Sequence, residues 1–173
     1  SQPSVAAWGH VQLSILGAVV VTASAGVSVL IEGNGDSVAG GIQTKLERDT
    51  PAQWCEYYGV PVKDGVAILY KALASDFTSR HGFSYQPGSV PMAPDWDDGQ
   101  TECGGGLHFS PNPKMALEFA PEAGKFVGCP VSLSDIVVHP DGQYPQKVKA
   151  RGCCGPVFEV DENGKPVGAA SGT

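Results

Sequence analysis

Cys103 and His108 are the first residues whose types and spacing suggest chemistry. They lie five positions apart, and the glycines between them form a flexible turn that could let both side chains face one ion. Zinc takes about four Cys or His ligands in near-tetrahedral geometry. Further ligands are available at Cys129, His139, Cys153 and Cys154. One prediction is therefore a zinc-stabilised binding domain, with Cys103, His108, Cys129 and Cys153 as ligands.

The same residues also have a purely structural interpretation. The sequence has no Cys-x-x-Cys pair, and a free cysteine is commonly a small buried apolar residue. His108 stands between Leu107 and Phe109, where a core histidine with one hydrogen bond would fit. The five cysteines are an odd number and are spread along the chain, which favours reduced thiols over a disulfide framework.

Composition limits the classes of function. With 11 Lys and Arg against 18 Asp and Glu, the net charge of −7 repels phosphate backbones, so we expect no nucleic-acid partner. The most apolar stretch, Val19 to Ile31, is too short and too polar to span a bilayer. The first residues lack the basic segment of a secretion signal. We therefore expect neither a membrane segment nor a signal peptide.

A β-repeat stalk is predicted for residues 1–44. Units of eight or nine residues begin at Gly9, Gly17 and Gly26, and apolar and polar residues alternate within them. Such coils bury their apolar face only against neighbours. We expect a β-solenoid or β-prism-like stalk that either contacts the next domain or self-associates, with a trimer favoured. Ordinary hairpin strands joined to the next domain's sheet are the alternative.

Residues 45–173 are predicted to form a small α+β domain with a mostly antiparallel sheet and two short helices. Asp49, Thr50 and Pro51 begin a helix that runs from Pro51 to Tyr58, and Ser110 with Pro111 opens a second helix that Pro121 ends. The predicted strands are Val62–Leu73, Phe126–Val131, Ile136–Val138, Lys147–Ala150 and Val157–Val160.

Two segments of this domain resemble a known family. They are YKALASDFTSRHGFSYQPG, from Tyr70 to Gly88, and ECGGGLHFSPNPKMALEF, from Glu102 to Phe119. Both are similar to a domain of unknown function common in phage and prophage proteins, and the resemblance covers residues 68–160. Ser110 and its neighbours stand where some members carry a second cysteine. The resemblance implies a location in a phage virion or in the host cytoplasm, with another phage or host protein as a further partner.

The order of strands, Gly-rich segment and helix is also similar to the half-fold of ADP-ribosyltransferases. That similarity implies NAD as substrate, with Lys71 or His108, Ser110 and Glu159 in the catalytic positions. Against it, three adjacent glycines match neither the P-loop nor the dinucleotide fingerprint.

The sequence contains no recognisable set of nucleophile, base and orienting residue. The resemblance to the phage-associated domain implies a phage or prophage-derived accessory module, displayed on or anchored by its self-associating stalk, with no established catalysis. The ADP-ribosyltransferase-like enzyme and the zinc-stabilised binding domain are the alternatives.

Overall fold

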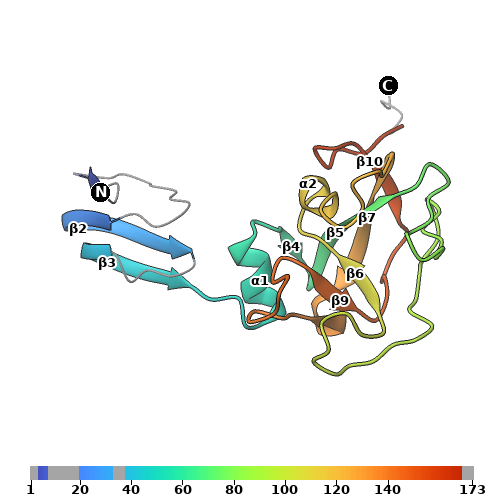
Figure 1. Cartoon of the computed structure of the whole chain (residues 1–173), viewed down its shortest axis with the longest axis horizontal. Helices are drawn as coiled ribbons and strands as arrows, with labels where there is room; N and C mark the ends of the chain where they lie inside the picture. Colours follow the sequence, from blue (N-terminus) through green and yellow to red (C-terminus); the bar gives the residue numbers. More distant parts are fainter. Residues whose placement is uncertain (1–3, 8–19, 33–37, 169–173) are drawn as a thin grey trace. The chain divides into compact units, whose positions relative to one another are not determined.

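The computed structural model describes residues 4–7, 20–32 and 38–168 (Figure 1). The chain divides into two compact units, Ser1–Glu47 and Arg48–Thr173. No helix among the described residues has both the length and the apolar character needed to cross a bilayer.

The first unit contains one open sheet of parallel strands. β1 (Ser4–Ala7), β2 (Val20–Glu32) and β3 (Val38–Leu46) are ordered β1-β2-β3, and both pairings are parallel. The prediction of a β-solenoid or β-prism is wrong, because the described strands do not close into a coil or prism. The predicted hairpin alternative does not describe these parallel pairings either. The first predicted repeat, Gly9 to Leu16, lies outside the described residues.

The prediction of a β-repeat failed at Gly26. It was expected to mark a turn between two units, yet β2 runs straight through it, so two predicted units form one long strand. The pairing of β2 with β3 shifts register between Ala23 and Ser28, on either side of Gly26. Glycine inside a strand commonly marks such an irregularity rather than a turn.

The second unit is an α+β domain with antiparallel strand pairing, as expected, but it contains two sheets where one was predicted. The four-stranded sheet has the order β10-β7-β5-β4 and the smaller sheet the order β6-β9-β8. The bounds are β4 Val62–Lys63, β5 Val66–Leu73, β6 Leu107–Phe109, β7 Lys125–Ser132, β8 Ile136–Val137, β9 Val148–Ala150 and β10 Phe158–Val160. The helices are α1 (Pro51–Tyr57), α2 (Pro113–Ala116) and the 3-10 turn η1 (Leu133–Asp135).

Helix α1 begins at Pro51, as the sequence predicts. Thr50 accepts a hydrogen bond from the Gln53 backbone, the Gln53 side chain accepts from the Thr50 backbone, and Pro51 occupies the first turn. Gly59 follows the helix with a φ of 68°, a conformation that glycine adopts readily. The helix buries Trp54 completely, and its indole Nε1 donates to the Pro145 carbonyl at 2.9 Å.

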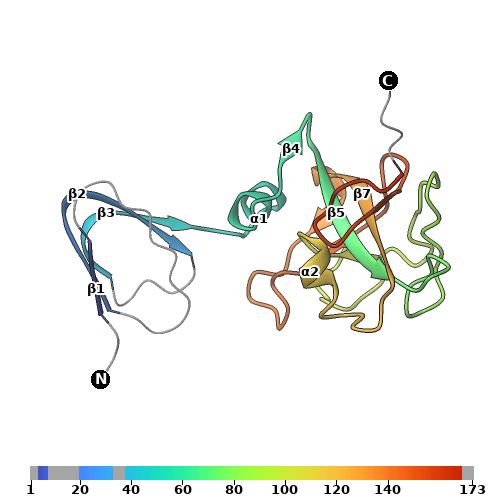
Figure 2. The same cartoon turned by 90° about the horizontal axis from the view of Figure 1, so that it is seen from above.

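Helix α2 is shorter and starts later than predicted. Asn112 is its N-cap and accepts from the Met115 backbone at 2.8 Å, and Pro113 fills the first turn. Ser110 instead remains extended and exchanges two backbone hydrogen bonds of 2.9 Å with Tyr70. This bridge joins the segment after β6 to β5, and α2 then lies against β5 (Figures 1 and 2).

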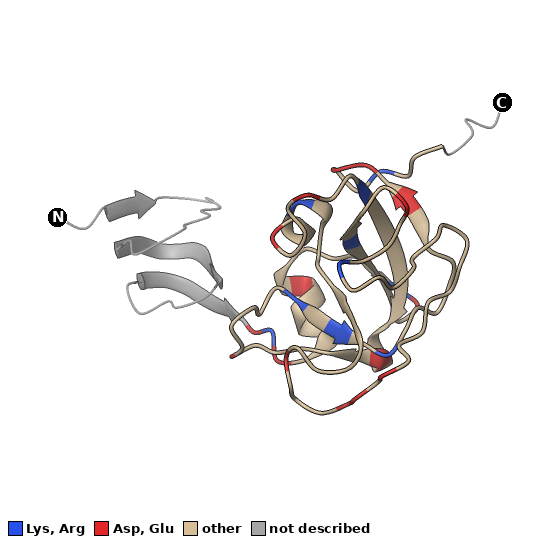
Figure 3. Ribbon diagram, turned by 45° about the vertical axis from the view of Figure 1, so that its right-hand side comes forward, with Lys and Arg blue, Asp and Glu red and all other residues tan. Residues whose placement is uncertain are grey.

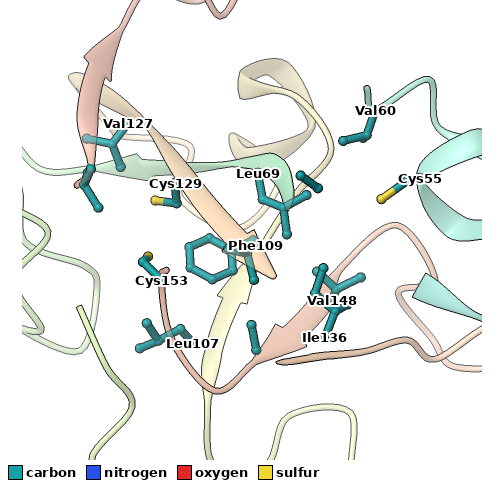
Figure 4. Packing of buried hydrophobic residues seen from close by; sticks show 14 of the residues in the cluster. Cys55, Val60, Leu69, Leu107, Phe109, Val127, Cys129, Ile136, Val148 and Cys153 are labelled. Carbon is teal, nitrogen blue, oxygen red and sulfur yellow. The ribbon is translucent and has the colours of Figure 1, made fainter. Parts of the chain in front are cut away.

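The core lies between the two sheets. Leu69, Val127 and Cys129 face it from the four-stranded sheet, and Phe109 and Val148 face it from the smaller one (Figure 4). All five side chains are fully or almost fully buried. The core therefore fixes β5 and β6 relative to each other, and these two strands carry the residues that the sequence singled out.

Candidate functional site

A pocket of about 230 Å³ opens beside β5, β6 and α2. Its floor and walls come from strand β5, the turn at 79–81, the segment from β6 to Ser110, helix α2 with the residues after it, and Lys147. The lining residues are Tyr70, Lys71, Ala72, Ser79, Arg80, His81, His108, Phe109, Ser110, Ala116, Phe119, Ala120 and Lys147.

The charge of this pocket is opposite to that of the whole chain. Lys71, Arg80 and Lys147 bring positive charge to it, His81 and His108 add two imidazoles, and none of the described lining residues is a carboxylate. The complete chain carries a net charge of −7. Figure 3 shows many of the acidic residues in loops, whereas Lys71 lies on β5. An anion would find an attractive local field here despite the acidic surroundings.

Lys71 reaches from β5 toward the edge of the core. Its Nζ donates to the His108 carbonyl at 2.9 Å and lies 5.2 Å from the centre of the Tyr85 ring and 6.0 Å from that of Phe109. Burial lowers the pKa of Lys71 to about 8, with Cys129 opposing this effect and the Lys147 ammonium adding to it. A larger share of this amine is therefore neutral near pH 7 than for an exposed lysine.

His108 is neutral at physiological pH. Burial, with the ammonium groups of Lys71 and Lys147, lowers the pKa of His108 to about 4. Its Nε2 is buried and has no hydrogen-bond partner among the described residues. A half-buried neutral imidazole with an unused nitrogen can accept or pass on a proton in this pocket.

Lys147 comes from the start of the β9 segment and is more than nine-tenths buried. Its Nζ donates a hydrogen bond to the Cys103 Sγ at 3.2 Å, and it lies 5.2 Å from the centre of the Phe119 ring and 5.1 Å from that of Tyr144. Aromatic faces stabilise a desolvated cation but do not occupy its remaining N–H groups. Lys147 is thus a buried cation with protons available for an acceptor.

Arg80 and His81 sit at the tip of a tight turn. The Gly82 amide donates to the Ser79 carbonyl at 2.8 Å, and Gly82 has a φ of 80° that suits glycine. Both tip residues are exposed. They can adjust to a ligand at the pocket rim without disturbing the core.

The predicted zinc ligands do not form one cluster. Cys129 and Cys153 lie together in the core (Figure 4), and the hydrogen bond between their sulfurs lowers the pKa of Cys153, while burial raises that of Cys129. Cys103 is exposed and lies beside the Lys147 ammonium, which would repel a cation. In the part of the chain that the structure describes, no three Cys, His, Asp or Glu residues are grouped to hold a metal ion. The described residues therefore do not fit the zinc set.

Two of the predicted transferase residues share the pocket, together with His108. Lys71 and Ser110 line it, whereas Glu159 is not among its lining residues. Glu159 lies opposite Val127, which lies opposite Lys71, so the Lys71 and Glu159 backbones stand two strands, or about 10 Å, apart on one sheet. The Glu159 carboxylate instead accepts from Lys125 at 2.7 Å.

The three adjacent glycines serve packing of the loop. A Cβ on Gly105 would collide with the Asp95 carbonyl, and one on Gly106 would lie 2.6 Å from the Lys149 Cγ. Lys149 is fully buried beneath this loop, and its Nζ donates to the carbonyls of Gly99 and Thr101 at 2.8 and 3.3 Å. The Gly-rich segment therefore packs tightly against Asp95 and Lys149 of its own domain.

Sequence reasoning missed three pocket residues, Arg80, His81 and Lys147. Arg80 and His81 precede a turn glycine, which signals exposure but no function. Lys147 was placed on a strand without any role, and only the pairing of β6 with β9 brings its segment to the pocket. Its signal was the spacing Lys147, Lys149 in a strand that is otherwise apolar.

Comparison with known proteins places this pocket in a domain family. No curated protein and no solved structure gives a significant match to the chain. Residues 67–152 match a family described as a domain of unknown function, DUF7666. All of the pocket-lining residues fall within that range. The pocket therefore belongs to a DUF7666 domain, found at residues 67–152 of this chain.

Proposed function

We propose that the unit Arg48–Thr173 is a binding module for a small anionic ligand, such as a carboxylate or a phosphate ester. The observation that supports this most directly is the cationic lining of the pocket. Lys147 is buried and Lys71 is partly buried, and neither has a carboxylate partner among the described residues. The ion pair found among those residues joins Lys125 and Glu159. Unpaired buried cations are costly, and a bound anion would offset that cost.

The size of the pocket favours a metabolite over a larger ligand. Sites for drug-sized molecules usually enclose about 300–1,000 Å³, and this one encloses about 230 Å³. Phe109, Phe119 and the alanines supply an apolar wall beside the cations. A compact molecule with one anionic end and one apolar or neutral end suits this lining.

Calorimetric titration of the full chain tests the proposal, with phosphate, pyrophosphate, pyruvate and NAD as probes. Arg80→Ala and Lys147→Met each remove one cation, and a charge-assisted hydrogen bond contributes roughly 1.5–3 kcal/mol. We therefore expect Kd to rise about tenfold or more for the anion that binds. Binding should also weaken as salt is added.

Arg151→Ala is the matched control, because Arg151 is exposed and lies outside the pocket lining. It should leave Kd unchanged. If no probe binds, or if Arg80→Ala and Arg151→Ala behave alike, the proposed pocket function is wrong.

The NAD-using transferase is the second candidate, supported by the placement of Lys71 and Ser110 in one pocket. NAD carries two phosphates and is larger than this cavity, so only part of it would enter. If NAD alone binds among the probes, and Ser110→Ala weakens it, the transferase becomes the better explanation.

We further propose that this binding unit belongs to a phage or prophage accessory protein that assembles as a homo-oligomer, with a trimer favoured. The support is the motif resemblance described above and the separate N-terminal unit Ser1–Glu47, whose sheet has β1 and β3 as its outer described strands. Outer strands offer backbone groups for pairing with another chain.

A further inference from the structure

Lys71 and Lys149 both lie in the region of the pocket, but they use their ammonium groups differently. It lines the cavity, is withdrawn from bulk water, and makes one hydrogen bond, to the His108 carbonyl. Lys149, in contrast, uses its ammonium to hold two loop carbonyls and does not line the pocket. Lys71 thus lines the cavity and, unlike Lys149, makes only one hydrogen bond.

The surroundings of Lys71 favour a nucleophilic amine. Desolvation and a second cation nearby both increase the neutral share of a lysine, and the neutral amine is the form that attacks carbonyl carbon. The second cation is Lys147, and it also lines the pocket. A ligand anion would pair with Lys147 and Arg80, leaving the other end of the molecule for Lys71.

We propose that Lys71 forms an imine with a small carbonyl compound that bears an anionic group, of the 2-oxo acid class. This inference rests on the proposed anion pocket, and it adds covalent chemistry to binding. The anionic group would occupy the cationic side of the pocket, and the carbonyl carbon would lie at the Lys71 Nζ.

The step balances without an oxidant or another reactant. The neutral Lys71 nitrogen bonds to the carbonyl carbon, and the carbonyl oxygen takes up a proton to give a carbinolamine. That oxygen then leaves as water with the second proton lost by nitrogen, and a carbon–nitrogen double bond remains. His108, neutral and with a free Nε2, lines the same pocket and can carry protons between nitrogen and oxygen.

Several groups around Lys71 set its pH dependence. Lys147 from the β9 segment and Cys129 from β7 act on its pKa, and the His108 carbonyl of β6 accepts its hydrogen bond. Tyr85 and Phe109 present ring faces to it, and Arg80 and His81 also line the pocket. Burial of Lys71 is the largest effect and lowers its pKa to about 8. The amine becomes reactive as pH rises through that value, well below the range of an exposed lysine.

Reductive trapping of the full chain tests the proposal. The protein is incubated with pyruvate and cyanoborohydride near pH 7.5, and the modified lysines are located by peptide mass spectrometry. From the difference in neutral fraction, we expect Lys71 to be modified roughly a hundredfold faster than the exposed Lys63 and Lys114 in the same sample. The rate at Lys71 should level off above about pH 8.

Two small molecules test the carbonyl group and the anionic group of the ligand separately. Acetone has the carbonyl without the anion and should label Lys71 slowly, whereas acetate has the anion without the carbonyl and should slow labelling by pyruvate. Lys71→Arg keeps the positive charge but cannot form an imine. In that variant, trapping at the pocket should disappear, while the exposed Lys63 and Lys114 in the same sample should be labelled as in the wild type.

The outcomes distinguish the two proposals. If pyruvate binds in the pocket but Lys71 is labelled no faster than Lys63, the imine is wrong and the anion pocket stands. If pyruvate neither binds nor labels Lys71, the imine is wrong and the anion pocket loses this ligand. Labelling of Lys71 that acetone matches in rate would also overturn the proposal, because the anionic group would then play no part.

Discussion

Burial makes protonation unfavourable at two histidines of this domain, His108 and His139. His108 is half-buried and has a free Nε2, and His139 is more than nine-tenths buried with both ring nitrogens lacking described partners. Burial is the main cause that lowers the pKa of each. An imidazolium at either position is therefore less stable than in the unfolded chain, where water surrounds it.

Acidification should accordingly destabilise the domain. As pH falls from about 6.5 to the His108 pKa of about 4, the unfolded chain binds a proton that the folded chain does not, so the free energy of unfolding decreases. The loss due to His108 is at most about 3 kcal/mol, and solvent screening of a half-buried ring reduces it. Urea unfolding of wild type and His108→Gln at several pH values measures the difference.

His81→Gln is the control for this experiment. Its imidazole is exposed, so water surrounds it in the folded and unfolded chains alike. The variant should follow the wild-type pH dependence, while His108→Gln should lose stability less steeply between pH 6.5 and 4. Identical slopes for wild type and His108→Gln would contradict the assignment of a buried neutral histidine.

At the level of single residues, the sequence indicated part of the site. Lys71, His108 and Ser110 were singled out from motifs, and the pocket contains all three. Lys147 was not recognised, because the spacing of Lys147 and Lys149 marks an unusual strand but does not show that strand pairing across a long loop brings Lys147 to the pocket. The zinc prediction rested on residue types and on the spacing of Cys103 and His108, and the structure places a lysine ammonium beside Cys103, a contact that spacing cannot reveal.

At the scale of the elements, the loop from Asp95 to Gly106 is held by side-chain hydrogen bonds and by a close contact between two of its own backbone segments. Glu102 accepts hydrogen bonds from the amides of Gln143 and Tyr144 at 3.0 and 2.6 Å, and Lys149 holds two loop carbonyls from below. Gly105 lies against the Asp95 carbonyl where no Cβ fits. This loop leads directly into β6 and therefore sets the position of His108.

Gly105→Ala should be strongly destabilising for this reason. The added methyl meets backbone, which cannot move aside as a flexible side chain can, and such overpacking costs roughly 1–3 kcal/mol or more. Gly124→Ala is the matched control, because nothing lies within 4 Å of a Cβ built there. It should change stability by no more than about 0.5 kcal/mol. Equal melting temperatures for the two variants would show that the loop is not packed as described.

The elements were predictable where local signals and tertiary structure agreed. Thr50 and Pro51 located the start of α1 correctly. The single strand predicted at Val62–Leu73 is found as two strands, β4 and β5. The second helix was placed too early, because Ser110 is held extended by its bridge to Tyr70 and Asn112 provides the N-cap instead. The repeat prediction failed at Gly26, where a glycine that suggested a turn lies inside a long strand.

At the scale of the whole molecule, the proposed homo-oligomer requires contacts between copies, which we assign to the N-terminal unit. If Ser1–Glu47 provides the contacts between copies, the full chain should have the native mass of a trimer. A truncated chain that begins at Arg48 should then be monomeric. Native mass spectrometry of both proteins measures this directly.

Circular dichroism of the truncated chain serves as the control, since a folded monomer is required for the comparison. A full-length monomer at micromolar concentration would contradict the proposal. A truncated chain that remains trimeric would instead move the contacts to the unit Arg48–Thr173.

The pairing of β5 with β7 has a consequence for how the pocket forms. Lys71 pairs across the sheet with Val127, and the pocket itself needs segments from Tyr70 to Lys147. Contacts between such distant positions require large loops to close first, which slows folding. No local segment can therefore assemble the cationic site early. We expect ligand binding to be among the last properties regained on refolding, after helix α1 has re-formed.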